Sequence, residues 1–192
     1  MARSEAASVA LYSLGSAEVL AAATAEVVQV LVDWGVLGTE RDALEVGCGI
    51  GRLLGPLSLR LRSIVGIDLS PGMIDAARRR TRDDANVTVL TTDGRDLSAI
   101  ADGAMDLVLG IDSLPYIVRA GAELVRSTFA EIHRVLRPHG DLVLCNYSYG
   151  HSRPDAAMEV ARLAEEHALV VVRSDVAPFR LWNAIAYHLR RA

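Results

Sequence analysis

The stretch that decides the fold covers residues 42–54 and reads DALEVGCGIGRLL. Three glycines, Gly47, Gly49 and Gly51, alternate directly after a short apolar run, and Glu45 stands two positions before the first of them. Glycine lets the backbone adopt positive φ and approach a ligand closely. A short apolar strand that ends in such a loop is typical of the ligand-binding edge of a parallel α/β sheet.

The rest of the chain alternates strand-like and helix-like patterns, and the last two strands are joined by a link too short for a helical crossover. Strands are predicted at 43–46, 63–67, 87–91, 105–111, 141–146, 169–174 and 181–189. Helices are predicted at 4–36 with a break at Gly15, and at 53–62, 70–82, 123–136 and 155–167. This order predicts an α/β fold with a seven-stranded, mostly parallel sheet, an antiparallel edge hairpin and helices on both faces.

The composition predicts a single folded domain without a nucleic-acid partner. The chain has 192 residues, 51% of them hydrophobic, and a net charge of −4. An acidic balance gives no general attraction to nucleic acid. The two cysteines, Cys48 and Cys145, form no disulfide or metal-binding pattern, and no signal peptide or bilayer-spanning run is found. We therefore expect a cytoplasmic protein with no membrane partner, whose oligomeric state stays open.

Two classes of ligand fit the glycine loop. A dinucleotide requires GxGxxG, but here the third glycine comes one position early and Arg52 stands where glycine is needed. S-adenosylmethionine has no phosphate and carries an ammonium and a sulfonium, which Glu45 attracts. The order of acid, spacer and GxGxG over residues 45–51 resembles the first motif of the class I methyltransferases, and the resemblance extends from residue 42 to about residue 145.

The resemblance implies a Rossmann-like methyltransferase domain over residues 1–192, with 1–38 as a helical lid and 39–192 as the cofactor-binding core. Asp68 ends the second strand and accepts hydrogen bonds from the ribose hydroxyls, a device that dinucleotide enzymes share. Leu69 and Met73 pack against the adenine, and Asp93 and Gly94 recognise its polar edge. The full set expected at the cofactor is Tyr12, Glu45, Gly47, Cys48, Gly49, Gly51, Asp68, Leu69, Met73, Asp93, Gly94 and Ile111.

The acceptor half of the site is less clearly marked. Asp112 follows the fourth strand beside the expected reacting methyl, and it is either a general base or a turn residue. Tyr147, Tyr149 and His151 leave the fifth strand at alternating positions. They either surround the substrate together with Tyr116, with His151 as a second candidate base, or are ordinary loop residues. No metal-ligand pattern is found.

The sequence therefore predicts an S-adenosylmethionine-dependent methyltransferase that acts on an oxygen or nitrogen atom of a small molecule. Two alternatives stay open at this point. One is an NAD-dependent oxidoreductase on the same sheet, which Arg52 and the edge hairpin disfavour. The other is a protein that binds the cofactor without catalysing transfer.

Overall fold

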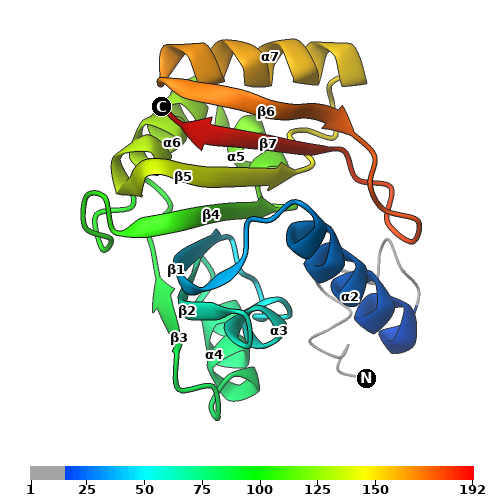
Figure 1. Cartoon of the computed structure of the whole chain (residues 1–192), viewed down its shortest axis with the longest axis vertical. Helices are drawn as coiled ribbons and strands as arrows, with labels where there is room; N and C mark the ends of the chain where they lie inside the picture. The colour runs from blue at the N-terminus through cyan, green and yellow to red at the C-terminus, as the bar shows by residue number, and fades with distance from the viewer. Residues whose placement is uncertain (1–15) are drawn as a thin grey trace.

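The computed structural model describes residues 16–192 and contains one seven-stranded sheet in the order β3-β2-β1-β4-β5-β7-β6 (Figure 1). The strands are β1 (Gly38–Val46), β2 (Leu61–Asp68), β3 (Val87–Thr91), β4 (Met105–Ile111), β5 (Leu136–Cys145), β6 (Leu169–Val176) and β7 (Ala186–Arg191). Strands β1 to β5 are parallel, and β7 lies antiparallel between β5 and β6. The predicted fold class is confirmed, including the antiparallel hairpin at the sheet edge.

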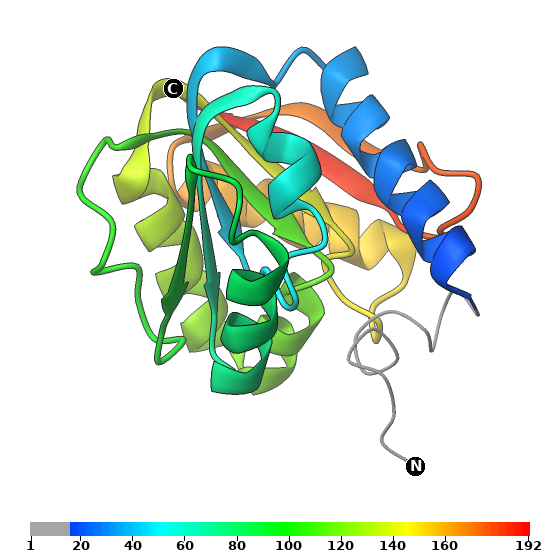
Figure 2. The same cartoon turned by 90° about the horizontal axis from the view of Figure 1, so that it is seen from below.

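Helices cover both faces of the sheet (Figures 1 and 2). They are α2 (Ala17–Asp33), α3 (Leu54–Ser58) and α4 (Pro71–Arg80) on one face, and α5 (Leu114–Ala120), α6 (Ala122–Val135) and α7 (Arg153–Glu166) on the other. Successive residues of a strand point to opposite faces. Accordingly, Ala43 and Leu44 of β1 are both fully buried, one in each of the two hydrophobic cores. Within residues 16–192, no helix has the length and apolar character needed to cross a membrane.

The helix predicted at 53–62 is wrong at its C-terminal end. The structure ends α3 at Ser58 and begins β2 at Leu61, which pairs with Gly38 of β1. The side-chain amide of Asn86 donates to the carbonyl oxygens of both Ser58 (2.9 Å) and Leu61 (3.1 Å), so it satisfies the backbone where the helix stops. The leucines of this segment, at positions 53, 54, 57, 59 and 61, are spaced too irregularly to show where a short buried helix ends and a buried strand begins.

The predictions near β4, β5 and β7 also need correction. No element is predicted between residues 111 and 123, but the structure forms helix α5 there, with Leu114 in the core and Pro115 in the first turn of the helix. Strand β5 begins at Leu136 rather than at residue 141, because residues 137–140 form a bulge within the pairing with β4. Strand β7 begins at Ala186 rather than at residue 181. In contrast, β3, β4 and the Ser70 cap of α4 lie where the sequence predicts them.

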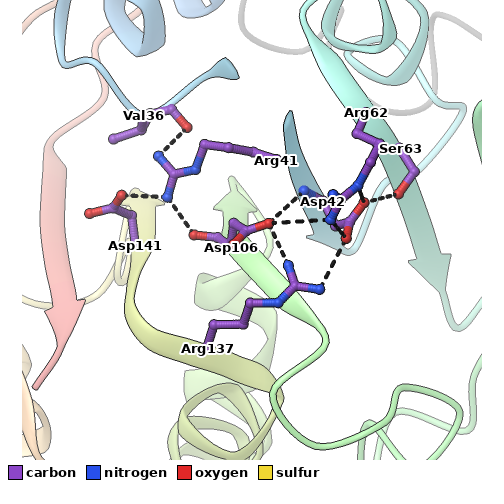
Figure 3. Close-up of polar contacts among 8 residues, drawn as sticks. All are labelled: Val36, Arg41, Asp42, Arg62, Ser63, Asp106, Arg137 and Asp141. Atoms are coloured by element: carbon purple, nitrogen blue, oxygen red, sulfur yellow. Dashed lines mark hydrogen bonds and ion pairs between the residues drawn. The ribbon is translucent and has the colours of Figure 1, made fainter. Parts of the chain in front are cut away.

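A polar network links four strands at the edge of the sheet opposite to their carboxyl ends (Figure 3). Arg41 of β1 donates to the carbonyl oxygens of Val36 (2.8 Å) and Asp106 (2.6 Å) and to the carboxylate of Asp141 (2.7 Å). Arg137 of β5 bridges the carboxylates of Asp106 and Asp42. Because each strand contributes a charged group, the network holds the strand starts in register.

Asp141 is the buried centre of a second part of this network. Its carboxylate accepts hydrogen bonds from Arg41, from Nε2 of His188 (2.8 Å) and from Nε of Arg190 (2.9 Å). Arg173 contacts the other ring nitrogen of His188, Nδ1, at 2.8 Å. Since a guanidinium only donates, Nδ1 must accept, and the imidazole proton lies on Nε2 facing Asp141. The three donors therefore converge on one buried carboxylate.

Candidate active site

A cavity of about 710 Å³ opens at the carboxyl ends of β1, β2 and β4. The glycine loop, the start of α4, the segment after β3, the α5–α6 region and Trp182 surround it. The structure brings eleven of the predicted site residues to its lining: Glu45, Gly47, Cys48, Gly49, Asp68, Leu69, Met73, Gly94, Ile111, Asp112 and Tyr116. Its volume lies within the range of small-molecule and cofactor sites.

The glycines of the loop are needed for different reasons. Gly47, Gly49 and Gly51 all have positive φ, of 74°, 55° and 71°. A Cβ at Gly47 would lie 2.5 Å from the Cβ of Ser113, and a Cβ at Gly51 would lie 3.0 Å from that of Ala77. Gly51 is not part of the cavity lining, and its contact with the cofactor stays a prediction. It lets α4 pack against the loop.

Asp68 holds the glycine loop in place. Its Oδ2 accepts a hydrogen bond from the backbone N–H of Gly49 (2.9 Å), and its Oδ1 accepts one from Ser70 (2.9 Å). Each carboxylate oxygen accepts more than one hydrogen bond. Asp68 therefore retains acceptor capacity toward the cavity while it fixes the loop that borders it.

Glu45 is an acid with an unsatisfied oxygen at the cavity. Its side chain lies within the sheet at 3% exposure, and Oε2 has no hydrogen-bond partner among the described residues. Burial raises the pKa of Glu45 to about 8, with Arg52 opposing the increase and Asp68 adding to it. A buried acid with a raised pKa and an unpartnered oxygen is suited to a cationic ligand group, because a nearby positive charge favours its ionised form.

Some of the residues predicted to contact adenine line the cavity, and others lie beside it. Leu69 and Met73 line the cavity, together with Leu97, which the sequence reasoning missed. Asp93 does not line it: its Oδ1 accepts from the backbone N–H of Arg95 (3.0 Å) in an exposed turn beside a smaller cavity. The carboxylate thus stabilises its own turn next to Gly94, which does line the cavity, and the adenine contact of Asp93 stays a prediction. The N–H of Gly94 donates to the hydroxyl oxygen of Thr92 at 3.1 Å.

Asp112 follows β4 in the cavity wall and has a left-handed conformation, with φ of 64°. Its Oδ1 accepts hydrogen bonds from the side-chain amide of Asn146 (2.9 Å) and from the hydroxyl of Tyr149 (2.5 Å). Oδ2 has no partner among residues 16–192. Asp112 is thus both a turn residue and a carboxylate that lines the cavity, so the two interpretations of this position are compatible.

Three of the predicted acceptor contacts lie outside the cavity lining. Tyr147 is buried in the core on the α7 side of the sheet and is 3% exposed. His151 is exposed and its Nδ1 contacts the hydroxyl oxygen of Ser148 at 2.8 Å. Tyr149 reaches the site only through Asp112. Tyr147 therefore packs in the core, and the role of His151 as a base stays a prediction; Tyr12 lies outside the described residues.

Arg52 and Trp182 line the cavity but were not among the predicted site residues. Trp182 belongs to a loop that is distant in sequence and that α2 fastens: the carboxylate of Glu26 accepts from the backbone N–H groups of Arg180 (2.8 Å) and Leu181 (3.1 Å). No motif marks such a residue in advance. Arg52 was noted only as a departure from the dinucleotide pattern, although its charge next to a ligand loop is a usable signal.

Comparison with known proteins assigns the family. The family described as "Methyltransferase domain" matches residues 44–144, just over half of the 192 residues. A demethylmenaquinone methyltransferase of Tropheryma whipplei (strain Twist) is 31% identical over 108 residues, which cover 56% of this chain and 42% of that protein. A malonyl-[acyl-carrier protein] O-methyltransferase of Hahella chejuensis is 33% identical over 128 residues, covering 66% of this chain and 43% of that protein. The chain thus spans less than half the length of these curated relatives.

The fold agrees with this assignment. Magnesium protoporphyrin IX methyltransferase from Synechocystis PCC 6803, solved with bound S-adenosylmethionine, superposes with a TM-score of 0.68 at 20% identity. The alignment covers 91% of this chain and 80% of that one. Motif, sheet order and family match agree, and the chain belongs to the class I S-adenosylmethionine-dependent methyltransferase family.

Proposed function

We propose that this chain transfers a methyl group from S-adenosylmethionine to an oxygen or nitrogen atom of a small molecule. The observation that carries the proposal is the pair of carboxyl groups at the cavity: Glu45 with a buried, unpartnered oxygen and Asp68 at the end of the neighbouring strand. A cationic nucleoside needs both features, a carboxylate for its positive charge and one for its ribose. A dinucleotide has no cationic group near its pyrophosphate for Glu45 to bind, and it requires the GxGxxG turn that this loop lacks.

The residues present fit this cofactor. Asp68 accepts from the ribose hydroxyls with its remaining lone pairs, and the apolar side chains of Leu69 and Met73 border the adenine. The unpartnered oxygen of Glu45 takes the amino-acid ammonium. Gly47 also lines the cavity, where the lack of a side chain lets the ligand approach the backbone closely. When bound, S-adenosylmethionine supplies an electrophilic methyl group on sulfur.

The protein aligns the acceptor and removes solvent. Ile111, Ile117 and Leu124 line the cavity near Asp112, and apolar walls exclude water from a transfer between two small ligands. The free oxygen of Asp112 takes the proton from an O–H or N–H acceptor. Tyr116, exposed at the rim, contacts the acceptor.

Helix α2, the described helix of the 1–38 segment, is the proposed lid over the core of 39–192. Leu20 of α2 belongs to the cavity wall, and Glu26 of the same helix holds the loop that carries Trp182. Helix α2 and the loop that carries Trp182 together cover one side of the cavity, which shields the reaction from water. We place the enzyme in the cytoplasm, in keeping with two buried free thiols.

Calorimetry with S-adenosylhomocysteine and NAD tests this function. We expect S-adenosylhomocysteine to bind and NAD to give no heat. Asp68→Ala is expected to weaken S-adenosylhomocysteine binding by about 1.5–3 kcal/mol, the scale of a hydrogen bond to a charged group. Asp83→Ala removes the same charge at an exposed position outside the cavity and is the matched control. Binding of NAD alone would refute the proposal, and full affinity in Asp68→Ala would remove Asp68 from the site.

Asp112→Asn tests the proposed base. The substitution keeps the shape of the side chain and one acceptor oxygen for Asn146 and Tyr149 but removes the basic oxygen. We expect roughly 100-fold slower methyl transfer from labelled cofactor to the acceptor found by metabolite screening, with S-adenosylhomocysteine affinity unchanged. A variant with wild-type turnover would leave Asp112 as a turn residue only.

A further inference from the structure

Arg52 places a positive charge in the wall of the cavity, at the end of the glycine loop. Its Nη1 donates to the hydroxyl oxygen of Thr24 on α2 at 3.1 Å, and its guanidinium carbon lies 5.9 Å from the ring centre of Trp182. The Thr24 hydroxyl donates in turn to the carbonyl oxygen of Leu20 at 2.7 Å. Thr24 and Trp182 thus hold the guanidinium in one position.

This cation has no anionic partner in contact with it. No carboxylate of residues 16–192 lies within ion-pair distance of Arg52, and Glu45 and Asp112 act on it only at longer range. A guanidinium carries five N–H donors and is always charged, and here one donor is used. A partly buried cation without a paired anion is costly to maintain. The unused donors therefore point to a ligand that is anionic.

Resting on the function proposed above, we propose that Arg52 is the carboxylate-binding residue of the cavity. Carboxylate is the anion whose geometry suits a planar guanidinium, through two parallel hydrogen bonds. Two carboxylates can reach this position: that of the cofactor's amino-acid end, or one carried by the acceptor. The first is favoured because Glu45, on the strand that leads into the same loop, has a free oxygen for the ammonium. Glu45 and Arg52 then bind the two charges of one α-amino acid.

The cofactor arm compares two probes that differ only in the carboxylate. S-adenosylhomocysteine has it, and S-adenosyl-3-thiopropylamine keeps the amine but lacks it. We expect the wild-type chain to bind the first at least tenfold more tightly in calorimetry, and Arg52→Met to lose that preference. A structural role for Arg52 would weaken both probes equally, so the ratio of affinities separates binding from folding. Arg60→Met, which removes an exposed arginine outside the cavity, is the charge control.

The acceptor arm uses benzoate, titrated into protein saturated with S-adenosylhomocysteine. If the acceptor supplies the carboxylate, benzoate binds the wild-type chain and Arg60→Met but not Arg52→Met, and the two cofactor probes keep their ratio. If Arg52→Met fails to fold, Arg52→Lys takes its place, because lysine keeps the positive charge. Lysine lacks the bidentate geometry of a guanidinium, so we expect a three- to tenfold loss of affinity in whichever arm applies.

The proposal is overturned if the arginine variants match the wild type in both arms, or if they weaken both cofactor probes alike and leave benzoate binding unchanged. A wild-type chain that binds no S-adenosylhomocysteine would refute the proposed function instead. In that case benzoate titrated into the free chain still tests Arg52, because the residue lines the cavity without the cofactor.

Discussion

Glu45→Gln will stabilise the chain at neutral pH and at the same time remove most of its affinity for S-adenosylmethionine. Burial raises the pKa of Glu45 to about 8, from 4.5 in the unfolded chain. A group whose pKa is higher in the folded state stabilises it fully below about pH 4.5, and this contribution is lost as the pH rises toward 8. Glutamine does not ionise in either state, so the variant avoids the free-energy cost of keeping this buried group protonated while it ionises in the unfolded chain.

The expected gain at pH 7 is about 3 kcal/mol, since pH 7 lies about 2.5 units above the unfolded pKa of 4.5 and each unit corresponds to roughly 1.4 kcal/mol. For a chain of this size, the melting temperature should rise by about 5–10 °C. Thermal unfolding between about pH 5 and about pH 8 should show the wild type losing stability relative to the variant as the pH increases. Glu40→Gln on the same strand, where the side chain is exposed, is the control and should leave both quantities unchanged.

Cofactor binding should change in the opposite direction. Without the carboxylate, the ammonium loses a charged hydrogen bond worth about 2–3 kcal/mol, or roughly 30- to 150-fold in affinity. In the wild type, a bound cation lowers the pKa of Glu45, so binding releases a proton and tightens between about pH 6 and about pH 7.5. The α-ammonium of the ligand itself begins to titrate near pH 8. Calorimetry that finds equal affinity and equal pH dependence in both proteins would refute this role of Glu45.

Asp141→Ala will be the most destabilising of the substitutions considered. Burial alone would raise the pKa of Asp141, but hydrogen bonds from His188, Arg41 and Arg190 overcome this and hold it at about 2. Alanine leaves Nε2 of the buried His188 imidazole without its acceptor and the guanidinium of Arg41 without its carboxylate partner. Breaking a buried charged cluster in this way costs about 3–5 kcal/mol, and we expect a melting temperature about 10–15 °C lower.

A control variant and the pH dependence distinguish the loss of the buried Asp141 cluster from the loss of an exposed ion pair. Asp102→Ala breaks a pair with Arg134 in which the acid is exposed, and it should cost less than about 1 kcal/mol. Because the folded pKa of Asp141 is depressed, its contribution is present above about pH 4 and is lost as the pH falls through about 2, so the variant should have a flatter acid limb. S-adenosylhomocysteine affinity well below the melting temperature should be unchanged, since the network lies at the other end of the strands. A melting temperature within about 2 °C of the wild type would contradict this account.

The sequence by itself determined the parts of this protein that depend on local pattern. Strand β4 and the start of α4 were predicted from a buried apolar run and from a serine cap followed by proline. Glu45 and Asp68 were predicted at the cavity because both belong to parallel strands, β1 and β2, whose carboxyl ends meet at one edge of a sheet. Short-range periodicity and the rules of parallel connections carry this information within a few residues.

Only the tertiary structure decided what depends on contacts between distant segments. Tyr147 and His151 were expected beside the substrate, but the turn after β5 sends one into the core and the other to the surface. Trp182 reaches the cavity because the Glu26 carboxylate holds its loop from a helix more than 150 positions earlier. The local sequence pattern assigns a residue to a helix or strand, but it does not determine where a loop side chain points. Long-range hydrogen bonds and core packing select that orientation from many accessible conformations.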